Sequence, residues 1–369
     1  MKQGWEIKKL GEVCEILDHL RVPITKKDRR EGVYPYYGAS GVQDYVDSYI
    51  FDGRYLLVGE DGAKWGANDK SAYIIEGKSW VNNHAHILKI NTKLSDRLVE
   101  YYLVSKDLQE YITGAVVPKL TQQALRSIPI PVPPIEEQER IVAELDCLSG
   151  IIEKKREQLK ELDALAESIF YTMFGDPITN EKGWVIKKLG EVCKTTSGGT
   201  PSKGHNEYYD GGTIPWLRSG EVNKMYIYDT ELFITEDGLK NSSAKWFPKE
   251  TVVVAMYGAT VGQVGILKNK MTTNQAICGI FPNKEFIPIY LYHFLLGKKA
   301  EYTEVAAGGA QPNISQNIIR DTWVCCPPIA TQQEFVEKIE AIEKQKELIK
   351  KSISETETLF NARMDYYFN

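Results

Sequence analysis

The chain contains the same eleven-residue segment twice. Residues 4–14 read Gly-Trp-Glu-Ile-Lys-Lys-Leu-Gly-Glu-Val-Cys, and residues 183–193 repeat them with one difference, Val185 in place of Glu6. A segment that returns in this way indicates two copies of one structural unit within the 369 residues. The alternative interpretation is a duplication that serves stability alone.

Three further landmarks recur in the same order, but at changing offsets. Gly62-Ala63 matches Gly258-Ala259, Asn83-His84-Ala85 matches Asn274-Gln275-Ala276, and Pro133-Pro134-Ile135 matches Pro327-Pro328-Ile329. From Pro118 and Pro312 onward the offset stays at 194. Insertions have therefore accumulated in the middle of each copy while its ends are held. A constant scaffold that carries a variable surface would have this pattern.

Each copy begins with a turn-rich region and closes with prolines. Apolar runs bounded by Gly, Asp and Asn predict short strands at residues 55–58, 85–90, 251–256 and 276–281. Residues 128–134 and 326–328 are rich in proline, which disfavours helix at the preceding residue and keeps the chain extended there. A helix is expected to begin after each of these stretches.

The two segments that follow have heptad spacing over about five heptads. The seam positions are Ile141, Leu145, Leu148, Ile152, Leu159, Leu162, Ala166 and Ile169 in the first copy, and Phe335, Ile339, Ile342, Ile349, Ile353 and Phe360 in the second. Lys155, Lys346, Thr356 and Arg363 interrupt the seams. An intramolecular antiparallel pair is favoured; packing of each helix on its own domain and an intermolecular coiled coil are the alternatives.

These observations predict an α+β fold, with two similar domains joined by two long antiparallel helices in an internal pseudo-twofold repeat. The expected boundaries are 1–135 for the first domain, 136–175 for the first helix, 176–182 for a linker, 183–329 for the second domain and 330–369 for the second helix. No apolar run is long enough to span a membrane, and the opening residues do not begin a signal peptide. Scattered cysteines without metal-ligand spacing favour a reducing, cytoplasmic setting with free thiols.

The net charge of −5 is unfavourable for a simple nucleic-acid binder. Residues 136–163 and 334–365 together hold 17 of the 50 acidic and 11 of the 45 basic residues. The remainder, with 33 acidic and 34 basic residues, is close to neutral. The acidity belongs to the predicted helices, so local basic faces remain possible elsewhere.

No motif for catalysis, cofactor binding or metal binding is found. The chain lacks a phosphate-binding Gly-rich loop, a dinucleotide-binding motif, a nucleophile elbow and an amino-methyltransferase motif. His84 and His86 form the only close histidine pair, and the second copy has Gln275 and Ile277 in their place. His84 is therefore interpreted as a hydrogen-bonding side chain. Glu60 and Asp61 are interpreted as part of a tight turn after a strand.

The candidate DNA-binding residues lie in the turn-rich regions. Phosphate contacts are expected from the basic run Arg21, Lys26, Lys27, Arg29 and Arg30, and from the hydroxyls, exposed amides and lysine of Gly198-Gly199-Thr200-Pro201-Ser202-Lys203. A solvated loop explains either segment about as well. Candidates for base contacts are Tyr36, Tyr37, Ser40, Lys64 and His84 in the first domain, and Lys203, Arg218, Ser219, Tyr257, Thr260 and Gln275 in the second. The aromatic and amide side chains among these could equally belong to the domain cores.

The whole chain resembles the specificity subunits of type I restriction–modification systems. The likeness is carried by the repeated residues 4–14 and 183–193, by residues 36–41, 56–62 and 198–202, by residues 133–138, and by the junction Met173-Phe174-Gly175-Asp176-Pro177. A departure is Ala330-Thr331-Gln332 where the first copy has Glu136-Glu137-Gln138.

The resemblance implies two target-recognition domains, each of which reads half of a bipartite, asymmetric site in double-stranded DNA. It implies that the helices set the gap between the half-sites and bind two adenine-N6 methyltransferase subunits, and through these the restriction–translocase subunits. The chain itself would be non-catalytic, bind neither cofactor nor metal, and have no membrane association. A coiled-coil assembly protein without nucleic-acid recognition is the main alternative, and an RNA-binding module is less favoured because no recognition-motif signature is found.

Overall fold

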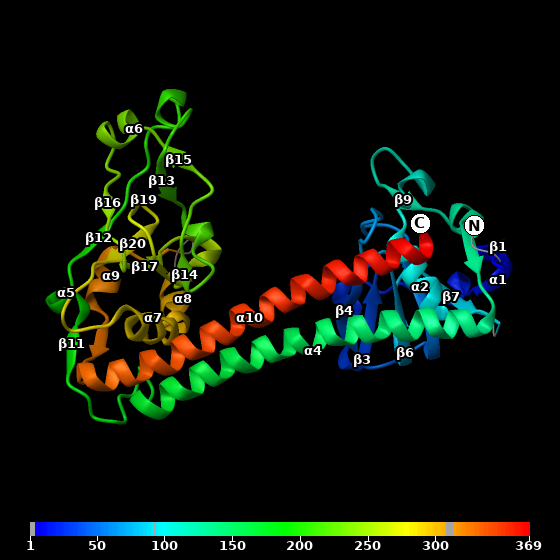
Figure 1. Ribbon diagram of the computed structural model, residues 1–369, viewed down its shortest axis with the longest axis horizontal. Coiled ribbons are helices and arrows are strands. Elements are labelled where there is room, and N and C mark those ends of the chain that lie inside the picture. Colours follow the sequence, from blue (N-terminus) through cyan, green and yellow to red (C-terminus); the bar gives the residue numbers. More distant parts are fainter. Residues whose placement is uncertain (1–3, 92, 308–312) are drawn as a thin grey trace. The chain divides into compact units, whose positions relative to one another are not determined.

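The computed structural model describes residues 4–91, 93–307 and 313–369; Pro312, one of the aligned prolines, lies outside them. The chain divides into two compact units, and each is described by itself. The first unit comprises residues Met1–Glu157 and Ile349–Asn369, and the second comprises Gln158–Leu348. Each unit holds one sheet-containing domain and a part of both long helices, α4 (Ile135–Phe174) and α10 (Ile329–Phe368) (Figure 1).

The first unit is built on a six-stranded sheet in the order β2-β7-β5-β6-β3-β4. Its strands are β2 (Cys14–Ile16), β3 (Glu31–Gly38), β4 (Gly41–Val46), β5 (Phe51–Gly59), β6 (Ala72–Val81) and β7 (Ala85–Ile90). Neighbouring strands are antiparallel except for the parallel pair β3 and β6. Leu56, Leu57 and Val58 of β5 are fully buried, as expected for a central strand that packs on both faces.

The second unit repeats four of the six strands of that sheet and replaces the other two. Its five-stranded sheet has the order β12-β20-β17-β18-β14, and its first four strands pair as β2-β7-β5-β6 do. The strands are β12 (Thr195–Ser197), β14 (Tyr226–Ile227), β17 (Val252–Ala255), β18 (Val264–Leu267) and β20 (Ile277–Ile280). A separate four-stranded sheet, β15-β13-β19-β16, consists of β13 (Ile214–Leu217), β15 (Phe233–Ile234), β16 (Trp246–Phe247) and β19 (Met271–Thr273). The predicted strands are confirmed, and the units differ in the middle of each copy.

The repeated eleven residues form the same corner in both units. Strand β1 (Glu6–Lys9) pairs with β10 (Pro129–Val132), and β11 (Ile186–Lys188) pairs with β21 (Trp323–Cys325), both antiparallel. The short helices α1 (Leu10–Val13) and α5 (Leu189–Val192) follow, and they bury Leu10 and Leu189. A Cβ added to Gly11 or Gly190 would lie 3.0 Å from the Cβ of Arg126 or Arg320, so this close packing of helices accounts for the repeated glycine.

A buried glutamine joins each long helix to its domain. The Gln138 side chain accepts a hydrogen bond from the backbone N–H of Ser95 (2.8 Å) and donates to the carbonyls of Lys93 (3.2 Å) and Pro133 (2.9 Å). In the second unit the Gln332 side chain accepts from Ile287 (2.8 Å) and donates to the carbonyls of Glu285 (2.9 Å) and Pro327 (3.0 Å). Ser95 and Ile287 are the N-cap residues of the equivalent helices α2 (Asp96–Ser105) and α7 (Pro288–Gly297). The same three hydrogen bonds therefore lock the start of both long helices.

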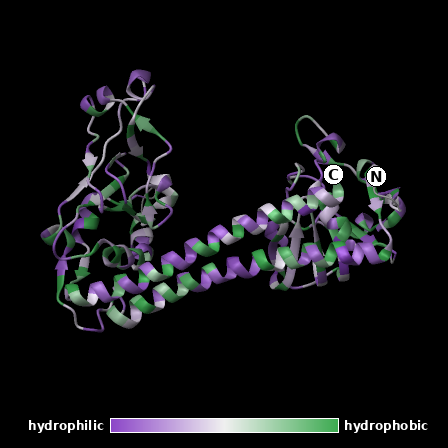
Figure 2. Ribbon diagram, viewed as in Figure 1, coloured by the Kyte–Doolittle hydropathy of each residue, from purple (hydrophilic) through white to green (hydrophobic). Residues whose placement is uncertain are grey.

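The long helices run antiparallel where they pair within each unit. In the first unit Arg363 donates a hydrogen bond to Glu144, and Lys155 donates one to Ser352. The residue numbers of the contacts therefore rise along α4 as they fall along α10. The second unit repeats this direction, with Asp163 beside Lys346 and Phe170 beside Phe335. The antiparallel helix pair predicted from the heptads is confirmed, and Figure 2 shows hydrophobic and hydrophilic residues alternating along both helices.

The polar residues that interrupt the heptads find partners on the opposite helix. The Lys155 ammonium donates to the hydroxyls of Ser352 and Thr356, the latter at 3.5 Å. The Lys346 ammonium lies 2.6 Å from a carboxylate oxygen of Asp163, and Arg363 pairs with Glu144. Polar residues in an apolar seam favour one register, because any slip would leave them buried without a partner.

Each long helix begins on one domain and ends on the other. Ile141 and Leu145 of α4 lie in the core of the first unit, together with Met364 and Phe368 from the end of α10. In the second unit the Phe174 ring of α4 packs against Tyr290 of α7, with ring centres 4.8 Å apart. Each domain is thereby closed by a helix that the other copy supplies.

The remaining elements are short. They are α3 (Gln122–Ser127), α6 (Glu236–Lys240), α8 (Lys299–Ala306), α9 (Gln316–Asp321), β8 (Ile112–Thr113) and β9 (Lys119–Leu120), with 3-10 turns at Asp18–Leu20, Lys26–Asp28, Gln109–Tyr111, Asn206–Tyr208, Ser219–Glu221 and Gly258–Thr260. All six cysteines are free thiols. Within the described ranges, no helix combines the length and the apolar character that crossing a bilayer requires.

Replacing Gln138 by leucine should destabilise the protein by about 2–4 kcal/mol, because a buried N–H and two buried carbonyls lose their partner. Gln332→Leu should have an effect of similar size. Urea-induced unfolding measures both, and Glu139→Leu, at the exposed next position of α4, is the control that should change stability by less than about 0.5 kcal/mol. A Gln138→Leu variant as stable as the control would contradict the locking role.

Candidate nucleic-acid interface

Several loops meet where β5 ends in the first unit. The Glu60 N–H donates to the His84 carbonyl (2.8 Å), and the Leu120 N–H donates to the Glu60 carbonyl (2.8 Å). A Cβ on Gly59 would lie 3.2 Å from the Ala39 carbonyl oxygen, so the turn between β3 and β4 is also close. Residues 39–40, 60–64 and 82–84 form what we term the first strand-end surface.

Three of the predicted base-contact residues belong to this surface. Ser40, Lys64 and His84 are exposed, and the His84 ring is paired with Asp61. Tyr37 is half-buried beside Tyr73, with ring centres 6.0 Å apart. Tyr36 is different: it is 1 % exposed and its hydroxyl donates to the Ile24 carbonyl (3.3 Å), so Tyr36 is a core residue.

The cations of the basic run are of two kinds: some are exposed to solvent, and others are paired with carboxylates of the domain. Lys26, Lys27 and Arg30 are exposed. The Arg29 guanidinium lies 3.1 Å from the Asp44 carboxylate and 4.2 Å from the centre of the Tyr36 ring. The hydrogen bond from Arg29 holds the pKa of Asp44 below its usual value. Arg29 therefore ties the run to the β3–β4 hairpin, and the other three carry the outward charge.

Arg21, the first residue of the basic run, lies apart from the other four and belongs to a buried ionic cluster. Its guanidinium is paired with Glu60 (2.5 Å) and Asp18 (3.5 Å), and it donates to the Ala85 carbonyl (2.9 Å). The Glu60 carboxylate also binds the Lys119 ammonium at 2.6 Å. The expectation that Arg21 contacts phosphate is not met in this arrangement, because its guanidinium is already paired with two carboxylates inside the domain.

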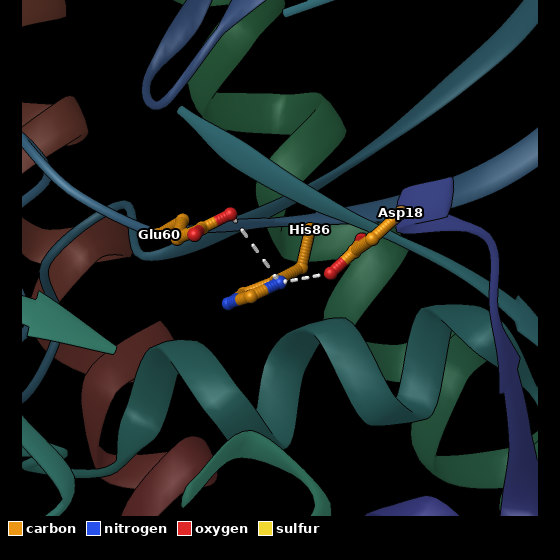
Figure 3. A group of neighbouring side chains, drawn as sticks. All are labelled: Asp18, Glu60 and His86. Atoms are coloured by element: carbon orange, nitrogen blue, oxygen red, sulfur yellow. Dashed lines mark hydrogen bonds and ion pairs between the residues drawn. The ribbon is translucent and has the colours of Figure 1, made fainter. Parts of the chain in front are cut away.

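His86 lies at the centre of the cluster, 1 % exposed, between Asp18 and Glu60 (Figure 3). Its Nδ1 is 2.6 Å from an Asp18 oxygen and its Nε2 is 2.7 Å from the Leu120 carbonyl. Each ring nitrogen therefore faces a hydrogen-bond acceptor, which fixes the orientation of the ring. Besides His86, the cluster holds the cations Arg21 and Lys119 and the carboxylates of Asp18 and Glu60.

Asp18, Glu60 and His86 offer atoms within 4.8 Å of one another, which makes them the group to test for a metal. Both ring nitrogens of His86 already lie against hydrogen-bond acceptors, and the carboxylates already bind Arg21, Lys119 and His86. The charges of Arg21 and Lys119 already balance those of the two carboxylates, so a further cation would meet no net negative charge. The cluster is therefore suited to fixing loops and does not suit a metal ion.

The carboxylates of this cluster are held ionised. Burial by itself would raise the pKa of Asp18 and of Glu60. For Asp18 the hydrogen bonds from His86 and from the Ile87 N–H, together with the neighbouring charges, outweigh burial. For Glu60 the hydrogen bonds from Lys119 and Arg21, together with the neighbouring charges, do so. The pKa values of both groups consequently lie below their usual values.

The second unit gathers four strand ends in the same way. The Asn274 N–H donates to the Leu217 carbonyl (2.9 Å) at the end of β13, and the Met256 N–H donates to the Ala276 carbonyl (2.8 Å) after β17. Thr200 donates to Gln275, and the Thr260 hydroxyl donates to the Tyr257 carbonyl (3.0 Å). Residues 200, 218–219, 256–260 and 274–275 form the second strand-end surface, which brings together Thr200, Arg218, Ser219, Tyr257, Thr260 and Gln275.

The glycines before Thr200 do not offer free amides to a phosphate, which corrects that expectation. The Gly198 N–H donates to the Ile277 carbonyl (3.3 Å) and the Gly199 N–H donates to the Thr273 carbonyl (2.9 Å). A Cβ on Gly198 would lie 2.1 Å from the Thr273 carbonyl oxygen, so close packing requires glycine. Ser202 and Lys203 are exposed beyond this turn, while Arg218 is paired with Glu221 (3.2 Å) and Glu231 (2.5 Å).

Reasoning from the sequence missed Asp18, Glu60, His86 and Lys119 as one cluster, and Gln138 and Gln332 as the helix locks. The cluster residues are far apart in the sequence, and no local pattern links them. The glutamines did carry a signal in the sequence. Gln138 and Gln332 align at the offset of 194 and are the same in both copies, although the preceding Glu136-Glu137 is replaced by Ala330-Thr331.

Acidification should weaken the first unit through this cluster. A carboxyl whose folded pKa is lowered stabilises the fold above its unfolded pKa, and this contribution is lost as the pH falls through the folded value. Asp18→Asn should therefore lower the unfolding free energy at about pH 7 and reduce the further loss between about pH 5 and pH 3. Urea unfolding across that range measures it, with Asp52→Asn, an exposed position of β5, as control. Parallel pH curves for Asp18→Asn and the wild type would contradict the assignment.

Comparison with known proteins gives consistent matches. The family model described as "Type I restriction modification DNA specificity domain" matches residues 2–163 and 181–358. A candidate type I restriction enzyme specificity subunit of Haemophilus influenzae is 28% identical over 377 residues, covering 98% of this chain and 94% of that protein. The MjaVIII specificity subunit of Methanocaldococcus jannaschii is 21% identical, covering 95% and 90%.

Two solved structures share the fold. The S subunit of a type I restriction–modification system from M. genitalium superposes with a TM-score of 0.60 at 14% identity, over 99% of this chain and 97% of that chain. A chain from a study of the assembly and conformational transition of a type I R-M system has a TM-score of 0.57 at 18% identity, over 100% and 98%.

Proposed function

Because the chain belongs to the family of type I restriction–modification DNA specificity domains, we propose that it reads a bipartite, asymmetric site in double-stranded DNA and recruits adenine-N6 methyltransferase subunits to it. Its relatives are named as specificity subunits, and the proposed role of the chain is non-catalytic. Two methyltransferase subunits, and restriction–translocase subunits bound through them, are the proposed protein partners.

The proposal rests on one observation: the two units share the same backbone arrangement but carry different side chains at the strand ends. Each unit has the same four-strand arrangement, corner and glutamine lock. At matching places the first strand-end surface has Glu60, Asp61 and His84, and the second has Met256, Tyr257 and Gln275. Unlike side chains on an equivalent frame would read unlike half-sites. Loops held by a rigid scaffold are the usual place for such readers.

The exposed side chains of the two units suit a division between contacts that position the DNA and contacts that read its bases. Lys26, Lys27, Arg30 and Lys203 are exposed cations that would neutralise phosphates, which carries affinity without sequence information. Lys64, His84, Tyr257 and Gln275 are exposed donors or acceptors at the strand ends, where base edges would be contacted. Ser40, Thr200, Ser202, Arg218, Ser219, Thr260 and the half-buried Tyr37 are proposed to support these contacts.

The deciding experiment is to co-express the chain with an adenine methyltransferase subunit and map N6-methyladenine across the host genome. The expected result is one motif of two short, unlike half-sites with a fixed gap, which disappears when the chain is omitted. An assembled complex that adds no methylation would overturn the proposal and favour a coiled-coil assembly role instead.

Removing the charges of Lys26, Lys27 and Arg30 together should weaken binding and flatten its salt dependence. The plot of log K against log salt has a negative slope, and the loss of three phosphate contacts should make it shallower by about 2.7. Fluorescence titrations of the assembled complex between about 50 and 200 mM salt measure the slope. Alanine at Lys89 and Lys93, exposed near the opposite end of β7, is the matched control and should leave the slope unchanged. An unchanged slope in the triple variant would exclude the run from phosphate contact.

Shortening both long helices by one heptad should change the gap and keep the half-sites. Residues 155–161 and 346–352 face each other in the antiparallel pair, as the Lys155–Ser352 and Asp163–Lys346 contacts indicate. Their joint removal shortens the pair by about 10.5 Å. At 3.4 Å per base pair the gap should shrink by about three base pairs. Methylome mapping gives the readout; altered half-site letters with an unaltered gap would refute the ruler role.

A further inference from the structure

The loop between β8 and β9 carries an exposed apolar tip. Residues 112–118 read Ile-Thr-Gly-Ala-Val-Val-Pro and include no charged side chain. Val116 is 94 % exposed and Val117 is 61 % exposed. Gly114 has φ +94, and a Cβ there would lie 2.4 Å from the Val117 carbonyl oxygen, so the tight turn requires glycine. Folding does not bury these valines, although burial is the usual position of valine.

The base of this hairpin is fixed to the first strand-end surface. Lys119 forms a β-bridge with Asp61, and its ammonium lies 2.6 Å from the Glu60 carboxylate. Leu120 is fully buried, and its carbonyl accepts the hydrogen bond from His86. The buried ionic cluster therefore holds the hairpin beside His84, the partner of Asp61. In Figure 1 the loop that precedes β9 projects from the body of the first unit.

The two copies keep the frame of this hairpin and change its tip. Gly114, Pro118 and Leu120 align at the offset of 194 with Gly308, Pro312 and Ile314. Between them Ala-Val-Val at residues 115–117 is replaced by Gly-Ala-Gln at residues 309–311. Residues 308–312 lie outside the described part of the chain, so this comparison is one of sequence alone. A constant frame with a variable tip is the pattern of a specificity determinant.

We propose that the tip of the β8–β9 hairpin, with Val116 as its principal side chain, makes an apolar contact with the bases of the half-site that the first unit reads. This rests on the proposed DNA-reading function. An uncharged tip has no attraction for phosphate, whereas a valine side chain can pack on a thymine methyl group or enter between stacked bases. The cations Lys26, Lys27 and Arg30 of the same unit supply the attraction to the backbone that the tip lacks.

The first test compares Val116→Asp with Val185→Asp, an exposed valine (64 %) on the frame of the second unit. Both assembled complexes are titrated against a duplex carrying the mapped motif. Val116→Asp should weaken binding about tenfold or more, and Val185→Asp should bind within about twofold of wild type. Wild-type affinity for Val116→Asp would overturn the proposal. So would loss of methyltransferase binding by Val116→Asp in size-exclusion chromatography, because the tip would then be a protein contact.

The second test exchanges the tip. Val116→Ala with Val117→Gln and Ala115→Gly gives the first copy the tip of the second. Methylome mapping should show relaxed or altered letters in one half-site only, with the other half-site and the gap unchanged. An unchanged motif would refute the inference. If the wild type itself adds no bipartite methylation, the proposed function fails first, so the two failures are distinguishable.

The third test separates the two forms of apolar contact. If Val116 packs on a thymine methyl group, uracil in place of thymine should weaken the wild type and leave Val116→Ala unaffected. If the valine enters the base stack, 2-aminopurine in the half-site should brighten with wild type and remain quenched with Val116→Ala. Either result supports the contact, and the absence of both overturns it.

Discussion

The three hydrogen bonds of one buried glutamine hold the structure of each unit together. Gln138 and Gln332 connect the first turn of a long helix, a proline-rich turn and the N-terminus of a helix that packs on the sheet. A buried amide has to be satisfied, so only one placement of the three segments avoids unpaired polar groups. The direction in which each long helix leaves its domain follows from this placement.

The frame therefore tolerates change at the strand ends. The first unit holds its surface with a buried ionic cluster in which every member has a partner, and such a cluster is stable only when it is complete. The second unit has Met256 and Tyr257 at the positions of Glu60 and Asp61, with Ile277 at that of His86, so its surface needs no buried charge. Either solution leaves the corner, the four shared strands and the glutamine lock unaltered. Unlike recognition surfaces on like frames are the outcome.

The long helices explain a charge balance that is unfavourable for DNA binding. Their exposed faces hold a large share of the acidic residues, while their seam is apolar with a few paired polar positions. This acidity belongs to the helices, whereas the exposed cations Lys26, Lys27, Arg30 and Lys203 belong to the sheet-containing domains. Net charge alone is a poor guide for a chain that divides spacing and reading between different elements.

The sequence by itself determined the internal repeat, the strands that flank each variable middle, and both long helices. These features rest on local signals: apolar periodicity, prolines at boundaries and heptads that only a paired helix can bury. Arg21 shows the limit, because in sequence it belongs with Lys26 and Arg30, and only the fold brings Glu60 and Asp18 to its guanidinium. The free amides expected at Gly198 and Gly199 disappear for the same reason, since their acceptors come from strands about 75 residues away. Tertiary structure alone decided which charges and amides face outward, because burial and pairing depend on residues that are distant along the chain.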